Sequence, residues 1–73
     1  MPTAAELKAR IEAAIEGSHA EVESADDVHF SARVVSGSFA GLSRIEQHKL
    51  VYQVFDGELG RSIHALSLKT ESL

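Results

Sequence analysis

Histidine is the residue of this chain best suited to metal or proton chemistry, and it occurs four times, whereas cysteine is absent. The four positions are His19, His29, His48 and His64. No two of them have the HxH, HxxxH or HExxH spacing that places two imidazoles on one face of a strand or helix. Any metal site must therefore be assembled by the fold. Without cysteine, the chain supplies no thiolate as a nucleophile or metal ligand.

His29 and His64 are the two candidates for such a site. His29 is expected to open the second strand and His64 the third, so that both lie where loops meet the sheet. Alternation along the third strand places His64 on the face of Leu66 and Leu68, at the rim of the core. There a neutral imidazole can donate from one ring nitrogen and present the other outward, as metal-ligating histidines usually do. A rim histidine that is satisfied by hydrogen bonds alone is the plainer alternative.

Nucleophilic catalysis has weaker support from the sequence. Three serines lie near one predicted loop, namely Ser36, Ser38 and Ser43. His48 and Asp56 are also available, but no nucleophile-elbow or triad signature surrounds these residues. We expect His48, like His19, to be structural or solvent-facing. A small hydrolase is therefore the least favoured class of function.

Composition indicates an ordinary folded protein. Hydrophobic residues make up 44% of the chain, charged residues 25%, and the net charge is −4. This length predicts a single domain over residues 1–73, with little room for a substrate pocket. The acidic balance argues against non-specific binding to nucleic acid or anionic lipid. Residues 1–6 lack the pattern of a secretion signal and no apolar run could span a membrane, so we expect a cytoplasmic protein.

The first half of the chain predicts one helix and two strands. Thr3 and Glu6 have the spacing of a capping box, and apolar residues then recur every fourth position, which predicts a helix ending at Gly17. Residues 20–24 and 28–36 alternate between apolar and polar side chains, as half-exposed strands do. The short polar turn between them predicts an antiparallel hairpin.

The second half predicts further helix and a third strand. Residues 36–41 are rich in glycine and serine, with Phe39 expected to anchor this loop to the core. Residues 42–59 have a helical pattern, with a break near Gln47 that gives a short helix and a longer one. Residues 63–70 alternate again. The predicted fold is α+β, in the order αββααβ, with the helices packed on one face of a three-stranded mixed sheet.

One short motif raises the question of nucleic-acid binding. Residues 57–60 fit the GxxG pattern by which KH domains clamp a phosphate backbone. The KH loop joins two helices, whereas this segment follows the last predicted helix. Glu58 within it would repel phosphate. We therefore do not expect a phosphate clamp here.

Several motifs together resemble the BolA family, whose pattern is roughly HF…VVS..F.G, then RHRLVY, then hHAL. The matching segments are His29-Phe30, Val34-Val35-Ser36, Phe39, Gly41, Gln47-His48-Lys49-Leu50-Val51-Tyr52 and Ile63-His64-Ala65-Leu66. The resemblance covers about residues 4–70. It implies the αββααβ fold, similar to a class II KH domain.

The resemblance also implies a function. BolA-like proteins pair with monothiol glutaredoxins, and the pair holds a bridging 2Fe–2S cluster used in iron–sulfur trafficking or iron sensing. The glutaredoxin supplies a cysteine and bound glutathione a second thiolate. The BolA-like chain supplies the histidine of the hHAL motif, here His64, and a His or Cys from the loop between its first two strands. Residues 25–28 contain neither, which leaves His29 as the nearest second ligand.

A second function stays open beside this non-enzymatic adaptor. Some BolA proteins are associated with transcriptional control of the stress response and cell morphology, which would make this chain a KH-like nucleic-acid-binding regulator. Its arginines are scattered along the sequence, and Gln47 stands where the family commonly has arginine. These features and the net charge favour the adaptor. The alternative partners are a second copy, forming a homodimer, and nucleic acid.

Overall fold

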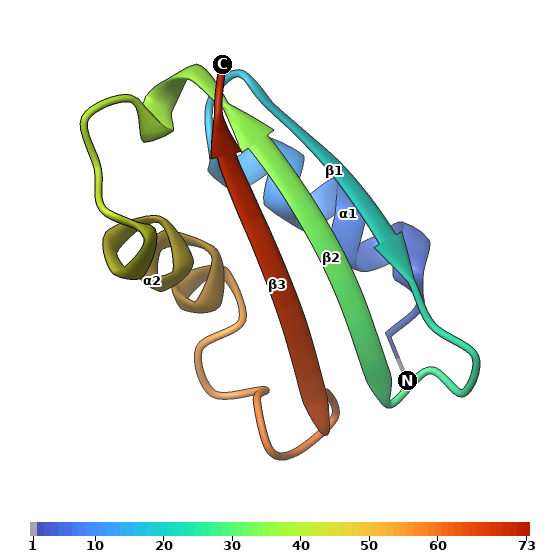
Figure 1. The fold of residues 1–73 in the computed structure, drawn as a ribbon. Coiled ribbons are helices and arrows are strands. Elements are labelled where there is room, and N and C mark those ends of the chain that lie inside the picture. Colours follow the sequence, from blue (N-terminus) through green and yellow to red (C-terminus); the bar gives the residue numbers. More distant parts are fainter. Residues whose placement is uncertain (1) are drawn as a thin grey trace.

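Three strands and two helices make up the fold in a computed structural model that describes residues 2–73. Met1, the first residue of the predicted domain, lies outside the described residues. The elements are α1 (Ala4–Ala14), β1 (Ser18–Glu23), β2 (His29–Ser36), the 3-10 turn η1 (Gly37–Phe39), α2 (Arg44–Val54) and β3 (Ala65–Ser72). The strand order is β1-β2-β3, antiparallel between β1 and β2 and parallel between β2 and β3 (Figure 1). The predicted α+β fold and mixed sheet are confirmed.

Helix α1 forms as its sequence pattern predicts. The Thr3 hydroxyl accepts a hydrogen bond from the Glu6 amide at 3.2 Å, which satisfies one of the free N–H groups at the helix start. Leu7 and Ile11 are completely buried on the face that packs against the sheet. The helix ends at Ala14, and Gly17 then turns the chain into β1 with a φ of 69°, a conformation that glycine adopts without strain. Strand β1 starts two residues earlier than predicted.

Strand β2 carries the centre of the core. Phe30, Ala32 and Val34 are buried, while the residues between them face solvent or are half-buried. This alternation is the predicted one, because successive side chains of a strand point to opposite faces of the sheet. One face of the sheet is thereby covered by the helices and the other is open to solvent.

Helix α2 corrects two predictions. It is one unbroken helix over Arg44–Val54, with no break near Gln47, and it stops before the predicted end at residue 59. Residues 55–62 form turns instead, in which Gly57 and Gly60 have φ values of 85° and 82°. Such left-handed backbone cannot continue a helix. The short helical segment that was expected inside this region lies earlier, as η1, where Phe39 is completely buried and anchors the loop as predicted.

Strand β3 is displaced by two residues from its prediction. It runs over Ala65–Ser72 rather than over 63–70. Ile63 precedes the strand and is completely buried, so an apolar residue of a turn was read as the first residue of the strand. Consequently His64 also lies before β3, in the connection that leads into it. Among residues 2–73, no helix is long and apolar enough to cross a membrane.

Candidate functional site

The fold brings the two predicted ligand residues, His29 and His64, into contact. Their rings meet edge to face, with centroids 5.1 Å apart and planes inclined by 76°. The parallel pairing of β2 with β3 causes this contact, because His29 is opposite Ala65 in the register and His64 directly precedes that residue. Both histidines are therefore at the end of the sheet where β2 and β3 begin (Figure 1).

His64 does not have the predicted environment at the rim of the core. Its side chain is exposed, because the alternation that was expected to turn it inward applies only within the strand. Its backbone N–H donates to the carbonyl of Val28 at 2.9 Å, which fixes the chain at this point. Its ring nitrogens have no hydrogen-bond partner in the part of the chain that the structure describes. The imidazole is thus positioned by the backbone and by the ring of His29, and both ring nitrogens are available.

Asp26 orients the ring of His29. One carboxylate oxygen accepts from the backbone amides of Val28 and His29 at 3.0 and 2.8 Å, and the other lies 2.7 Å from His29 Nδ1. The hydrogen bond from the His29 amide, followed by that from its ring, holds the pKa of Asp26 well below its usual range. An ionised carboxylate can only accept, so Nδ1 carries the proton and Nε2 of the neutral ring is free to bind a metal. Carboxylate, imidazole and metal are commonly linked in this order in metalloproteins.

The sequence prediction missed the role of Asp26. The available signal was its position in the turn, since aspartate commonly accepts from backbone amides two and three residues later. Asp27 completes this turn with a φ of 59°. The turn that was expected only to connect two strands therefore also positions a candidate ligand.

The histidine pair is an incomplete metal site on its own. Within residues 2–73 there is no group of three or more His, Cys, Asp or Glu side chains that could hold a metal ion. A structural zinc site uses four protein ligands, and a 2Fe–2S cluster likewise needs four. Two imidazoles with free nitrogens fit half of such a set. The remainder would have to come from another molecule.

The other two histidines lie on separate elements. His19 is exposed on β1. His48 is half-buried on α2, with its ring edge to face with that of Tyr52 at 6.4 Å between centroids. Neither contributes to the histidine pair, and both agree with the expectation of a structural or solvent-facing role.

The serines considered for catalysis make structural hydrogen bonds. The hydroxyls of Ser36 and Ser38 both donate to the carbonyl of Glu16 at 3.0 Å. Ser43 caps α2 in a complete capping box with Glu46. None of these hydroxyls is hydrogen-bonded to a histidine in the described chain. The geometry gives no nucleophile paired with a base.

The glycine motif at 57–60 is tied to α1. Arg10 donates to a carboxylate oxygen of Glu58 at 2.9 Å, makes a second bond to the other oxygen, and also donates to the Val54 carbonyl at 3.1 Å. Its guanidinium lies 4.8 Å from the centroid of the Phe55 ring, within the range of a cation–π interaction. The hydrogen bond with Arg10 lowers the pKa of Glu58. This segment therefore ties the turns after α2 to α1, and its carboxylate is paired with Arg10.

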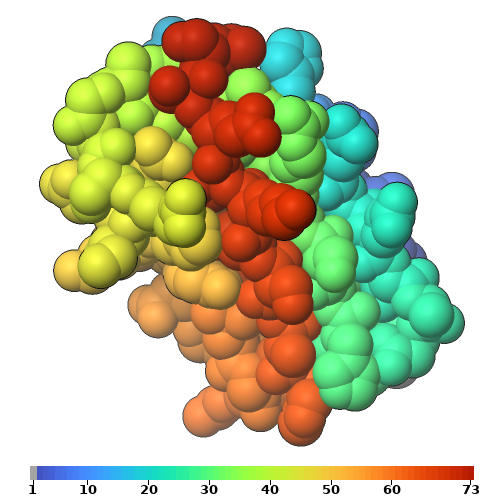
Figure 2. Space-filling view, in the orientation of Figure 1, coloured from blue at the N-terminus to red at the C-terminus, as the bar shows by residue number. Residues whose placement is uncertain are grey.

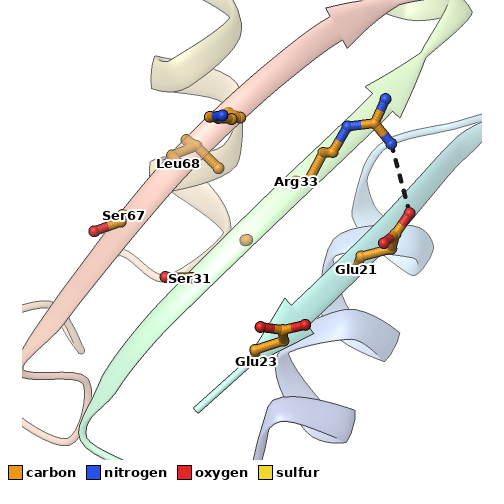
Figure 3. A pocket seen from close by; sticks show the side chains of 8 residues that line it. Glu21, Glu23, Ser31, Arg33, Ser67 and Leu68 are labelled. Atoms are coloured by element: carbon orange, nitrogen blue, oxygen red, sulfur yellow. Dashed lines mark hydrogen bonds and ion pairs between the residues drawn. The ribbon is translucent and has the colours of Figure 1, made fainter.

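The open face of the sheet contains a shallow hollow of about 370 Å³. Polar and charged residues of all three strands line it, and Figure 3 shows Arg33 reaching toward Glu21. Arg33 lies 3.5 Å from a carboxylate oxygen of Glu21 and 3.1 Å from one of Glu71. Arg33, the central cation of the hollow, is thus paired on both sides.

Comparisons with known proteins identify the family and its fold. The model of the family described as BolA-like protein matches residues 4–73. The BolA protein homologue from Coxiella burnetii superimposes with a TM-score of 0.83 at 36% identity, covering 99% of this chain and 92% of that one. BolA-like protein 1 of mouse is 31% identical over 97% of this chain, which spans 58% of the mouse protein. The DNA-binding transcriptional regulator BolA of Vibrio cholerae is 48% identical over 58% of this chain and 40% of its own length. The match over almost the whole sequence and the shared fold show that this chain belongs to the BolA-like family.

Proposed function

We propose that this chain is a cytoplasmic, non-enzymatic adaptor that pairs with a monothiol glutaredoxin and shares a 2Fe–2S cluster with it, for iron–sulfur trafficking or iron and stress regulation. The contact between His29 and His64 carries the proposal, because it places two imidazoles with free nitrogens at one exposed end of the sheet. In this assignment His64 is the principal ligand. His29 is the second, since the loop before it contains neither His nor Cys.

The available ligands support a site shared with a partner rather than one formed by this chain alone. The chain has no cysteine, so the two thiolates that complete four-fold ligation come from the glutaredoxin and from glutathione. Ligation by neutral imidazole in place of thiolate would remove negative charge from a 2Fe–2S cluster and raise its potential. Both histidines are exposed, so a partner can approach them without unfolding any element.

Within this chain each residue has a defined task. Asp26 keeps the proton on Nδ1 of His29, so that Nε2 faces the partner as a lone-pair donor. The bond from the His64 amide to Val28 holds the second ring beside the first. Imidazole must be neutral to bind iron, so acid is expected to release the cluster by protonating the ligands.

The test replaces each histidine by alanine and records visible absorption and circular dichroism of the reconstituted complex with glutaredoxin and glutathione. We expect His64→Ala to change or abolish the cluster spectrum, and His29→Ala to change it to a smaller degree. His19→Ala is the matched control, because His19 is also exposed but lies on β1. An unchanged spectrum for His64→Ala would refute the assignment, and calorimetry without the cluster would show whether the two proteins still associate.

A second candidate function is nucleic-acid binding in transcriptional control of the stress response and cell morphology. The name of the Vibrio cholerae relative, DNA-binding transcriptional regulator BolA, supports it, as does the family resemblance. The net charge of −4 weighs against it. Gel shifts with duplex and single-stranded DNA over a series of salt concentrations test this function. Micromolar affinity at physiological salt would place it ahead of the adaptor.

A further inference from the structure

Strand β3 has an unpaired edge. It is the last strand in the order β1-β2-β3, so only one side of it has a neighbour. The amides of Ala65 and Leu73 donate to Val28 and Ser36, which shows that the odd-numbered residues direct their backbone groups toward β2. In a parallel pair the residues between them direct both N–H and C=O to the other side. The backbone groups of Leu68, Thr70 and Ser72 therefore point outward.

Most of this edge has no partner within the described residues. The Tyr52 hydroxyl donates to the carbonyl of Leu66 at 3.0 Å. This bond occupies the first outward-pointing carbonyl of β3. No corresponding bond to the backbone of residues 68, 70 or 72 is formed by the rest of the described chain. A row of free backbone donors and acceptors is a template for an added strand.

The opposite edge of the sheet is occupied at Ala20. On β1, the Ala20 carbonyl accepts from Lys8 Nζ at 3.1 Å, and the Ala20 amide donates to Glu12 at 3.0 Å. Lys8 and Glu12 are themselves paired at 2.7 Å across one turn of α1. Side chains of a helix thus occupy the backbone groups at the middle of this edge, and the two edges of the sheet are not equivalent.

A groove runs beside the open edge. It has a volume of about 380 Å³ and is lined by Arg44, His48, Leu68, Lys69, Thr70 and Glu71. Figure 2 shows the start of α2, in yellow, beside β3, in red. The groove is cationic although the chain is acidic, because Arg44 and Lys69 form no ion pair within the described residues and Glu71 is paired with Arg33.

We propose that this groove binds an extended acidic segment of a partner protein, which adds to the edge of β3 as a strand. Backbone hydrogen bonds to residues 68, 70 and 72 would supply affinity, as in other complexes formed by strand addition. Carboxylates of the segment would face Arg44 and Lys69, which sets the preference for an acidic sequence. The groove begins at Leu68, four residues after His64, which is about 13 Å along the strand at about 3.3 Å for each residue. The proposal uses none of the candidate cluster ligands.

The geometry favours a peptide over the other occupants. Single-stranded nucleic acid is usually held by exposed aromatic rings on which bases stack. Among the residues that line this groove only His48 carries a ring, and that ring is half-buried and already edge to face with Tyr52. A second copy would have to bring its own α2 beside this one, whereas the groove has room for only a few residues of extended chain. An extended segment meets the backbone groups and the cations without either difficulty.

The test is an NMR titration of the full chain with an acetylated and amidated eight-residue peptide of alternating threonine and glutamate. We expect saturable shifts of the amides of residues 68, 70 and 72, with little change at His29 and His64. Lys69→Glu should weaken the affinity about tenfold or more, because it reverses a charge at the groove. Arg61→Glu is the matched control, since Arg61 is exposed in the 55–62 turns and outside the groove.

Four results would overturn the proposal. The first is the absence of saturable shifts at millimolar peptide, and the second is equal binding of a peptide with lysine in place of glutamate. The third is unchanged binding when alternate peptide amides are N-methylated, because methylation removes the donors that a strand needs. The fourth is evidence for another occupant of this edge. Preferential binding of oligothymidylate would assign the edge to nucleic acid, and concentration-dependent shifts of the same amides without peptide would assign it to a second copy.

Discussion

The two ends of strand β2 differ in burial and in what holds them. At its last residue, Ser36 is completely buried, donates from its hydroxyl to Glu16 and accepts from the Ser38 amide, both at 3.0 Å. Its carbonyl also accepts from Leu73. At its first residue, His29 is exposed and its ring is held by the exposed carboxylate of Asp26.

Within this one strand, the residues that stabilise the fold are therefore separate from the residues that could bind a metal. The buried end joins the turn after α1, η1 and the last residue of the chain through one serine, so changes there are expected to weaken the whole fold. The exposed end carries the candidate ligands on turns, where side chains can be altered at small cost to folding. The substitutions below test this separation.

The largest effect is expected from Phe39→Ala, beside the buried end of β2. Phe39 is completely buried in η1, and truncating a buried phenylalanine typically costs about 3–5 kcal/mol of unfolding free energy. Urea unfolding followed by circular dichroism measures the loss. Ile45→Ala is the control, because Ile45 is 70% exposed and should change the stability by less than about 0.5 kcal/mol. Equal midpoints for the two variants would contradict the importance of this end.

A smaller loss is expected from Ser36→Ala. The change leaves the Ser38 amide without its partner and removes one of the two hydroxyls that donate to the Glu16 carbonyl, and each lost hydrogen bond costs about 0.5–1.5 kcal/mol. Chemical denaturation of this variant is compared with that of Ser67→Ala, which removes an exposed hydroxyl from β3. Equal stability of the two serine variants would contradict the importance of the buried end of β2 for stability.

Acid should act on the exposed end through Asp26. Its pKa is lowered in the folded chain, first by the hydrogen bond from the His29 amide. The carboxylate therefore stabilises the fold fully above its ordinary pKa of 3.8, and this contribution is lost progressively as the pH falls below that value. The stability difference between the wild type and Asp26→Asn should be constant near neutral pH and shrink in acid. A difference that does not change with pH would show that the hydrogen bonds from His29 do not lower the pKa of Asp26.

The smallest effect on stability is expected from His64→Ala. Its side chain is exposed and forms no hydrogen bond within the described chain, so the unfolding free energy should change by less than about 0.5 kcal/mol. The same substitution is expected to have the largest effect on the cluster spectrum. Thermal melts and spectra of one preparation therefore test both halves of the comparison. A large loss of stability would make His64 a structural residue instead.

Most of the fold could be predicted because its signals are local. The Thr3–Glu6 spacing and the alternation of β2 depend on neighbouring residues, and the structure confirms both. The end of α2 could not be placed, because the apolar residues after Val54 continue a helical pattern although Gly57 and Gly60 adopt left-handed backbone. Periodicity records which residues are apolar, not whether the backbone between them is helical.

The candidate site was predictable in its residues but not in its arrangement. The family motifs identified His64, and His29 followed as the nearest second ligand because residues 25–28 contain neither His nor Cys. The contact between the two rings depends on the register between β2 and β3, which the sequence does not reveal. The same register, together with the turn, decides that Asp26 reaches Nδ1 of His29. The exposure of His64 was missed because the first residues of β3 were placed two positions too early.

The covered edge of β1 also limits how these chains can polymerise. Open-ended stacking of sheets requires each subunit to offer two free edges, and Lys8 and Glu12 occupy the backbone of Ala20 on one of them. If two chains were joined through β3, both open edges would be used up and the assembly would stop there. A single ion pair on α1 thereby works against fibre formation in a small protein with an exposed strand.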